Sequence, residues 1–155
     1  MSAQDNMERT LVIIKPDAIQ RRLVGEIITR FERRGLRFIA MKMIKIDRPL
    51  AERHYAEHKG KVFYQPLLDF ITAAPAVVAV LEGYKAISAV RCMLGATNPA
   101  EAEPGTIRAD FAMQTRYNLV HGSDSPETAK REIGLFFEPQ EIVSQPRPTD
   151  SFVFE

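Results

Sequence analysis

Residues 118–127 read Asn118-Leu119-Val120-His121-Gly122-Ser123-Asp124-Ser125-Pro126-Glu127. The apolar pair before the histidine predicts the end of a short strand, and the Gly-Ser-Asp run after it predicts a turn. Ser125 is a favoured helix cap and Pro126 suits the first helical position, so a helix is expected to begin here. This succession of strand, turn and helix would hold His121 on a rigid scaffold with its side chain facing open space.

An imidazole in that position has a definite chemistry. It is largely neutral near pH 7, is nucleophilic through either nitrogen and accepts a phosphoryl group reversibly. The second nitrogen of His121 then needs a hydrogen-bond acceptor, and Glu132, within the predicted helix, would supply one if the helix folds back over the turn. A lone histidine beside a turn is more often structural or merely exposed, so the rest of the chain must decide.

Length and composition predict one compact domain of the α/β type with a full hydrophobic core. The chain has 155 residues, of which 45% are apolar and 26% charged, as is usual for a globular protein. Its net charge of +1 gives no basic field for general nucleic-acid binding, so nucleic acid is not expected as the main partner and any anion site must be local.

The sequence also predicts a cytoplasmic location. No apolar run reaches the ~18 residues of a membrane span, and the polar residues 1–8 do not resemble a secretion signal. The single cysteine, Cys92, excludes an intrachain disulfide and is expected to be a small buried apolar residue. Metal-ligand spacing of the CxxC or HExxH kind does not occur.

Hydrophobic periodicity predicts four strands and at least five helices. The expected strands are Leu11–Ile14, Leu36–Ile46, Ala76–Leu81 and Asn118–Val120, with a possible bulge at Met43–Ile44. The expected helices are Leu23–Phe31, Pro49–Lys59, Phe63–Ala74, Ala86–Leu94 and Pro126–Phe137. Residues 96–117 predict a long ordered loop or lid, and residues 139–155 an extended tail whose last apolar residues dock on this subunit or on a neighbour.

No glycine-rich phosphate loop is present, because Gly60-Lys61 has Tyr55 where such a loop needs its first glycine. Bound phosphates would therefore need point charges and hydroxyls. Lys15, Arg91, Thr97 and Arg108 are placed for this role, although each alone is more often a solvated surface residue.

Aromatic and histidine side chains gather around Gly60. Tyr55 and Phe63 are either core residues at a helix corner or, if exposed, platforms for a nucleotide base. His54 and His58 have the spacing of a metal pair on one helix, but no third ligand is evident, and surface imidazoles are the simpler interpretation.

Five segments, taken in chain order, resemble the nucleoside diphosphate kinase family from about Glu8 to Gln140. They are Lys15–Asp17, Leu23–Ile28, Met93–Pro99, Pro104–Arg108 and Asn118–Ser125. The His-Gly-Ser-Asp run with its upstream asparagine is highly specific to that family.

The resemblance implies a ferredoxin-like α+β fold, with a four-stranded antiparallel sheet covered by helices, in a single domain spanning residues 1–155. It implies transfer of the terminal phosphate of a nucleoside triphosphate, mainly ATP, to a nucleoside diphosphate through a phosphohistidine intermediate. Mg²⁺ would be held through the nucleotide phosphates, and bases and both ribose forms would be tolerated broadly. The long tail resembles the hexamer-forming members more than the tetrameric ones.

The resemblance also implies roles for particular residues. His121 matches the phosphorylated histidine, with Glu132 orienting the ring and Ser123 supporting Glu132. The nucleotide would be bound by residues that match a ribose and phosphate pair (Lys15, Asn118), a residue beside the reacting phosphate (Tyr55), a phosphate clamp (Arg91, Thr97, Arg108) and a base-stacking aromatic (Phe63).

Two residues depart from the family pattern. Ala18 stands where many members have glycine, and Lys61 stands where an arginine often assists the phosphates, which keeps the charge but loses the planar fork.

Two other functions remain open at the level of sequence. One is a catalytically idle module that binds nucleotides or nucleic acid, and the other is transfer of the phosphoryl group to protein histidines. An idle module has no need to keep the nucleophile, its orienting carboxylate and the clamp together.

Overall fold

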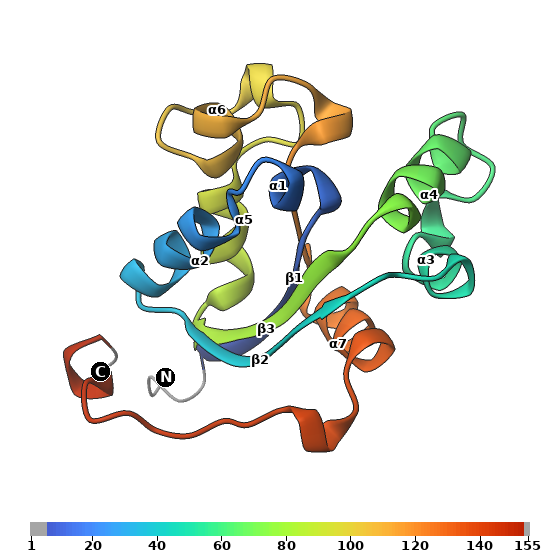
Figure 1. Cartoon of the computed structure of the whole chain (residues 1–155). Helices are drawn as coiled ribbons and strands as arrows, with labels where there is room; N and C mark the ends of the chain where they lie inside the picture. The colour runs from blue at the N-terminus through green and yellow to red at the C-terminus, as the bar shows by residue number, and fades with distance from the viewer. Residues whose placement is uncertain (1–5, 154–155) are drawn as a thin grey trace.

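The computed structural model describes residues 6–153. Its four strands are β1 (Met7–Ile14), β2 (Arg37–Ile44), β3 (Ala76–Tyr84) and β4 (Val120–Gly122). They form one antiparallel sheet in the order β2-β3-β1-β4. The seven α-helices are α1 (Pro16–Gln20), α2 (Val24–Arg33), α3 (Arg48–His54), α4 (Tyr64–Ala73), α5 (Ala86–Leu94), α6 (Ile107–Phe111) and α7 (Pro126–Phe136). This strand order, with helices on the sheet, confirms the ferredoxin-like α+β fold (Figure 1).

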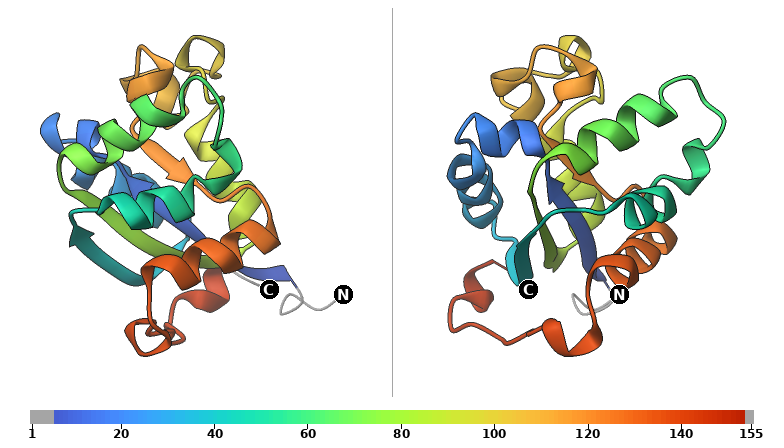
Figure 2. Two further views of the ribbon diagram at one scale, coloured as in Figure 1. Left: turned by 90° about the vertical axis from the view of Figure 1, so that its right-hand side faces the viewer. Right: turned by 45° about the vertical axis from the view of Figure 1, so that its right-hand side comes forward.

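The sheet is covered on both faces, because successive residues of a strand point to opposite sides. Val12 and Ile14 of β1 belong to a core formed with α1, α2, α5 and α6. Leu11 and Ile13 belong to a second core formed with α3, α4 and α7. Figure 2 shows the blue α2 and the teal and green α3 and α4 on opposite sides of the sheet. The continuous apolar runs of β1 and β3 follow from this double coverage.

All four predicted strands are present, but two details of the prediction were wrong. The bulge lies between Phe38 and Ala40, not at Met43–Ile44. Ile39 and Ala40 are consecutive buried residues, which marks the interruption of the alternating pattern. Met43 is apolar but exposed, so counting it as buried placed the interruption at the wrong residues. The last strand is Val120–Gly122 and contains His121, which therefore does not follow the strand.

Residues 96–117 are more ordered than the predicted loop. They contain α6, whose N-cap Thr106 accepts a hydrogen bond from the backbone N–H of Ala109 at 3.2 Å. They also contain the 3₁₀ turns Pro99–Glu101 and Thr115–Tyr117. Elements this short bury too few residues to show a helical period in sequence.

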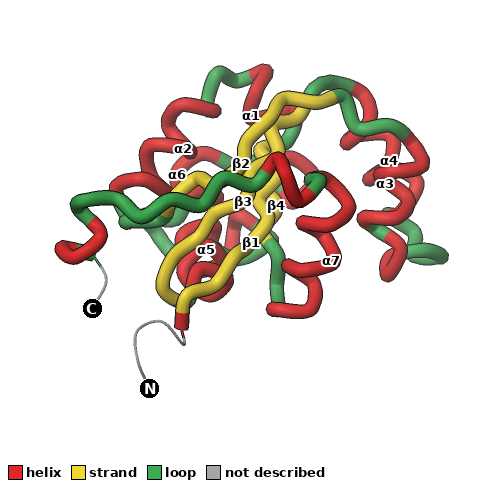
Figure 3. The backbone as a smooth tube through the Cα atoms, turned by 90° about the horizontal axis from the view of Figure 1, so that it is seen from below, coloured by secondary structure: helices red, strands yellow, loops and turns green. Residues whose placement is uncertain are grey.

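The C-terminal segment runs across the sheet from the end of α7 toward α2, as Figure 3 shows from below. It includes the 3₁₀ turns Pro139–Glu141 and Asp150–Phe152. The backbone N–H of Val143 donates to Ile39 at 2.8 Å, and Arg37 donates to Asp150 at 2.6 Å. The tail thus docks on its own subunit, while Phe152 remains 89% exposed. The predicted docking of the last aromatic, Phe154, lies outside the described residues.

One further prediction about a single residue was wrong. Cys92 is exposed, because α5 turns Ile87 and Val90 toward the core and Cys92 away from it.

Within residues 6–153, no helix combines the length and the apolar character that crossing a membrane requires.

Candidate active site

The site is assembled where β4 pairs with the end of β1 and α7 folds back over it. Ser125 caps α7 as predicted, with its hydroxyl accepting from the backbone N–H of Thr128 at 3.1 Å. His121 lies in β4 opposite Ile13 of β1. Gly122 has no side chain, and a Cβ there would lie only 3.0 Å from Leu94 of α5, so the glycine allows this helix to pack closely behind the histidine.

His121, Ser123 and Glu132 form one hydrogen-bonded group. Nε2 of His121 lies 2.7 Å from Oε2 of Glu132, and the Ser123 hydroxyl donates to Oε1 at 2.7 Å. A carboxylate accepts, so Nε2 carries the proton and Nδ1 keeps its lone pair. The Glu132 side chain is 2% exposed and that of His121 is 25% exposed. The predicted pairing of these residues is therefore present, with Nδ1 as the available nitrogen.

Glu132 remains a carboxylate in this buried position. Burial by itself raises its pKa, but the hydrogen bond and charge of His121, the neighbouring His54 and the Ser123 hydroxyl together hold the pKa below its usual value. The group can therefore orient the imidazole through Nε2–H and stabilise positive charge that develops on it.

Basic side chains converge on the backbone that precedes β4. Nζ of Lys15 donates to the side-chain oxygen of Asn118, whose amide donates to the carbonyl of Thr97 at 2.9 Å. The guanidinium of Arg108 is buried and donates to the carbonyls of Asn118, Gly95 and Val120 at 3.3, 2.9 and 2.6 Å. Four of the predicted nucleotide-binding residues are thus brought together, and Arg108 also braces the chain.

The cations in this cluster crowd one another. Burial lowers the pKa of Lys15 to about 8, an effect offset by Asp17 and reinforced by Arg108. Burial, and to a smaller extent the nearby Arg91, lowers the pKa of Arg108 to about 10. Arg91 itself is exposed on the last turn of α5. Neighbouring like charges of this kind fit a site that receives an anion.

Leu119 links this cluster to the strand through a strained conformation. Its φ of 74° lies in the left-handed region, which is unusual for a leucine. Its N–H donates to Asp17 at 3.1 Å, and its carbonyl accepts from the N–H of Lys15 at 2.8 Å. The strain is held by these two contacts directly before His121.

Aromatic rings connect the histidine to the predicted base platform. Centroid separations are 4.7 Å for His121 and His54, 4.4 Å for His54 and Tyr55, 6.1 Å for Tyr55 and His58, and 5.3 Å for His58 and Phe63. Tyr55 is buried, and burial followed by the Glu132 charge raises its pKa. Phe63 is 50% exposed and ends this series of ring contacts, so its face is available to stack on a base.

The prediction that His54 is a surface imidazole was wrong, since it is 3% exposed and its Nδ1 lies 3.1 Å from Oε2 of Glu132. His58 is not its partner on one helix, because α3 ends at His54 and His58 belongs to a separate 3₁₀ turn, Ala56–His58. His54, His121 and Glu132 do have ligand atoms within 4.8 Å of one another. Only the tertiary packing of α3 against α7 could reveal this grouping.

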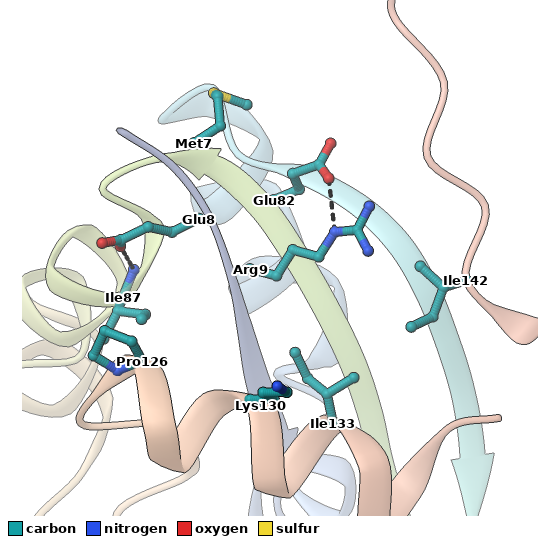
Figure 4. A pocket seen from close by; sticks show the side chains of 9 residues that line it. All are labelled: Met7, Glu8, Arg9, Glu82, Ile87, Pro126, Lys130, Ile133 and Ile142. Atoms are coloured by element: carbon teal, nitrogen blue, oxygen red, sulfur yellow. Dashed lines mark hydrogen bonds and ion pairs between the residues drawn. The ribbon is translucent and has the colours of Figure 1, made fainter. Parts of the chain in front are cut away.

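A separate groove of about 570 Å³ opens at the other end of β1 (Figure 4). Arg9 and Glu82 form an ion pair at 2.9 Å on its wall, and Glu8 accepts the backbone N–H of Ile87 at 3.1 Å. None of the predicted site residues lines this groove.

An oriented histidine nucleophile beside a cluster of cations, carried on a ferredoxin-like sheet, defines a phosphotransferase of the histidine type. The comparisons with known proteins agree. The family model described as nucleoside diphosphate kinase matches residues 8–142, and the chain belongs to that family.

Close relatives and solved structures carry the same name. A nucleoside diphosphate kinase from Thermomicrobium roseum is 58% identical over 147 residues, covering 95% of this chain and 99% of its own length. One from Thermococcus kodakarensis is 58% identical over 153 residues, covering 97% of this chain and 88% of its own length. The Halobacterium salinarum enzyme, solved in complex with CDP, superposes with a TM-score of 0.93 at 45% identity and covers 96% of this chain and 99% of its own.

Proposed function

We infer that this chain transfers the terminal phosphate of a nucleoside triphosphate, mainly ATP, to a nucleoside diphosphate through a phosphohistidine at Nδ1 of His121. Membership of the family makes it a phosphotransferase between these nucleotides and does not favour an idle binding module. The observation that carries the assignment is the 2.7 Å contact of Nε2 with Glu132, which leaves Nδ1 unprotonated.

The reaction then has two balanced halves. The Nδ1 lone pair attacks the terminal phosphorus, an N–P bond forms, and the bond from that phosphorus to the bridging oxygen breaks, releasing the nucleoside diphosphate. Phosphorylation places positive charge on the ring, which the Glu132 carboxylate stabilises. The terminal oxygen of a second nucleoside diphosphate then attacks the phosphorus, an O–P bond forms and the N–P bond breaks, which releases the nucleoside triphosphate and returns the ring to its neutral state.

The nucleotide would lie between the base platform and the cations. Phe63 stacks on a base without reading its edge, so broad base tolerance is expected. Lys15 and Asn118 are assigned to the ribose hydroxyl and nearby oxygens, Tyr55 to the reacting phosphate, and Arg91, Thr97 and Arg108 to the phosphates. These groups supply fixed positive charge where the transition state spreads negative charge.

Mg²⁺ fits this site only together with the nucleotide. The side chains grouped near the phosphate positions are cations, an amide, a hydroxyl and the Asp17 carboxylate, which accepts from the N–H of Leu119. Glu132 is already occupied by His121 and Ser123. The ion would therefore be held by the phosphates, whose charge it would neutralise together with Lys15, Arg91 and Arg108.

The decisive experiment incubates the protein with γ-labelled ATP and Mg²⁺ and then adds GDP. The label should be stable to alkali, labile to acid, transferred to GDP and absent from His121→Ala, while His58→Ala labels normally. A label that GDP cannot remove would contradict the nucleotide as acceptor and favour transfer to protein histidines. An unlabelled wild-type protein that still binds ADP would instead favour the idle module.

We also propose a cytoplasmic, single-domain protein that assembles as a hexamer, with a tetramer as the alternative. The support is the length of the tail and its exposed Phe152. Light scattering at micromolar concentration should give a mass six times that of the chain, and a monomer would overturn the assembly.

A further inference from the structure

His54 occupies an unusual place at the end of α3. Its ring lies edge-on between that of His121, at 4.7 Å and 83°, and that of Phe136, at 5.4 Å. Its Nδ1 lies 3.1 Å from Oε2 of Glu132, the same oxygen that accepts from His121. The ring therefore contacts both members of the histidine–carboxylate pair.

This arrangement is unfavourable for folding alone. His54 is 3% exposed, and neither ring nitrogen makes a well-directed hydrogen bond to the described residues. Buried polar atoms without such bonds destabilise a fold, and an apolar side chain would fill this space without them. Costly polar groups packed against a nucleophile are typical of functional positions.

The charge state of His54 follows from its surroundings. Burial, then the neighbouring His121, lowers its pKa to about 3, so the ring is neutral at any pH at which the enzyme would work. The groups that face it are Glu132 and Arg131 from α7, His121 from β4, and His58. A lone pair on Nδ1 would be repelled by the carboxylate 3.1 Å away, so the single proton belongs on Nδ1.

We propose that His54 is a positioning residue for phosphoryl transfer, whose Nδ1–H holds the Glu132 carboxylate against Nε2–H of His121. Two hydrogen bonds then hold the carboxylate, from Ser123 on Oε1 and from His121 on Oε2. Nδ1 of His54 adds a close polar contact to Oε2 at 3.1 Å. Because His54 is neutral, it positions Glu132 without forming an ion pair with it, and the carboxylate charge remains available to stabilise positive charge on His121. His121 is kept in the form whose Nδ1 can attack. This inference rests on the proposed function of His121.

The test compares two substitutions of His54 by single-turnover phosphorylation from γ-labelled ATP. His54→Asn places an amide N–H near the position of Nδ1, and His54→Leu removes the donor but fills the space. His54→Leu should slow phosphorylation roughly 10- to 100-fold, as loss of an orienting partner does, with the KM for the nucleotide unchanged within about twofold. His54→Asn should recover most of the rate.

Two readouts separate positioning from packing. The chain has three histidines, so ¹⁵N NMR of labelled histidine resolves each ring, and His54→Leu should raise the fraction of His121 that is protonated at Nδ1. Thermal melting should show His54→Leu to be no less stable than wild type. The control Phe136→Leu alters packing on the same ring without removing a donor; it should lower the melting temperature and leave the rate nearly unchanged.

The proposal is overturned if His54→Leu phosphorylates at the wild-type rate, if His54→Asn is as slow as His54→Leu, or if Phe136→Leu is equally slow. An unchanged His121 tautomer in His54→Leu would also overturn it. Failure of the wild-type protein to label at His121 would instead refute the proposed function, so the two failures are distinct.

Discussion

Glu132→Gln tests the orienting role of the carboxylate because it preserves shape and removes charge. Glu132 accepts one hydrogen bond on each oxygen, both at 2.7 Å, whereas glutamine has a single acceptor oxygen. If the amide NH₂ of the glutamine faced His121, it would point at Nε2–H, and two donors would face each other. The NH₂ must therefore face Ser123, whose hydroxyl oxygen can accept from it.

The size of the effect follows from this geometry. His121 keeps its hydrogen bond, but a charged acceptor becomes a neutral one, a loss of about 1–2 kcal/mol. If the whole loss appears in the transition state, the phosphorylation rate falls by about 5- to 30-fold. The reaction is slowed and not abolished, because the nucleophile and the cations remain in place.

The assay is rapid-quench, single-turnover phosphorylation by γ-labelled ATP at saturating nucleotide, so that binding does not enter the rate. Glu127→Gln is the matched control, since Glu127 is exposed on the first turn of the same helix; its rate should equal that of wild type. A Glu132→Gln rate within twofold of wild type would refute the orienting role. A loss as complete as that of His121→Ala would show that Glu132 does more than orient the ring.

Three other substitutions or conditions probe the nucleotide side of the site. Phe63→Ala removes a half-exposed platform, so the KM for every nucleotide should rise by a similar factor, about fivefold for about 1 kcal/mol of stacking; a selective loss for one base would argue against simple stacking. Raising the pH through about 8 neutralises Lys15, so the KM for ADP should increase. Between this pH and the ordinary lysine pKa, the folded state binds fewer protons than the unfolded state, so the free energy of unfolding should increase as the pH rises. An ADP KM that is constant from pH 7 to about 9.5 would contradict this ionisation of Lys15. Arg108→Lys cannot reach all three carbonyls that Arg108 contacts, so urea denaturation should show a loss of about 3 kcal/mol, and unchanged stability would show that Arg108 does not brace the chain.

Much of this fold is encoded in local patterns. The continuous apolar runs before Lys15 and after Pro75 predicted buried strands, and the Ser125 cap placed the start of α7 correctly. The strand order was not accessible in this way, because short antiparallel strands carry no sequence signal for their neighbours. The fold class followed from the family resemblance and is confirmed by the sheet.

The site was less predictable where tertiary packing decides a residue's environment. Glu132 was expected to reach His121, since both flank one turn and one helix. His54 was assigned to the surface because no third metal ligand was evident in the sequence, and nothing local indicates that its ring packs against Phe136 of α7. Arg108 was expected as a phosphate ligand only, and its three bonds to backbone carbonyls depend on a chain path that sequence patterns do not define.

The shortness of β4 has a consequence for how the enzyme loses activity. This edge strand pairs with only Val12–Ile14, whereas β3 pairs along the whole of β1. Its local opening needs far fewer broken contacts than global unfolding, so amide hydrogens near His121 should exchange with solvent earlier than those of β1 and β3. Warming would then inactivate the protein before the bulk of its sheet melts, and cooling would restore it without refolding of the two cores.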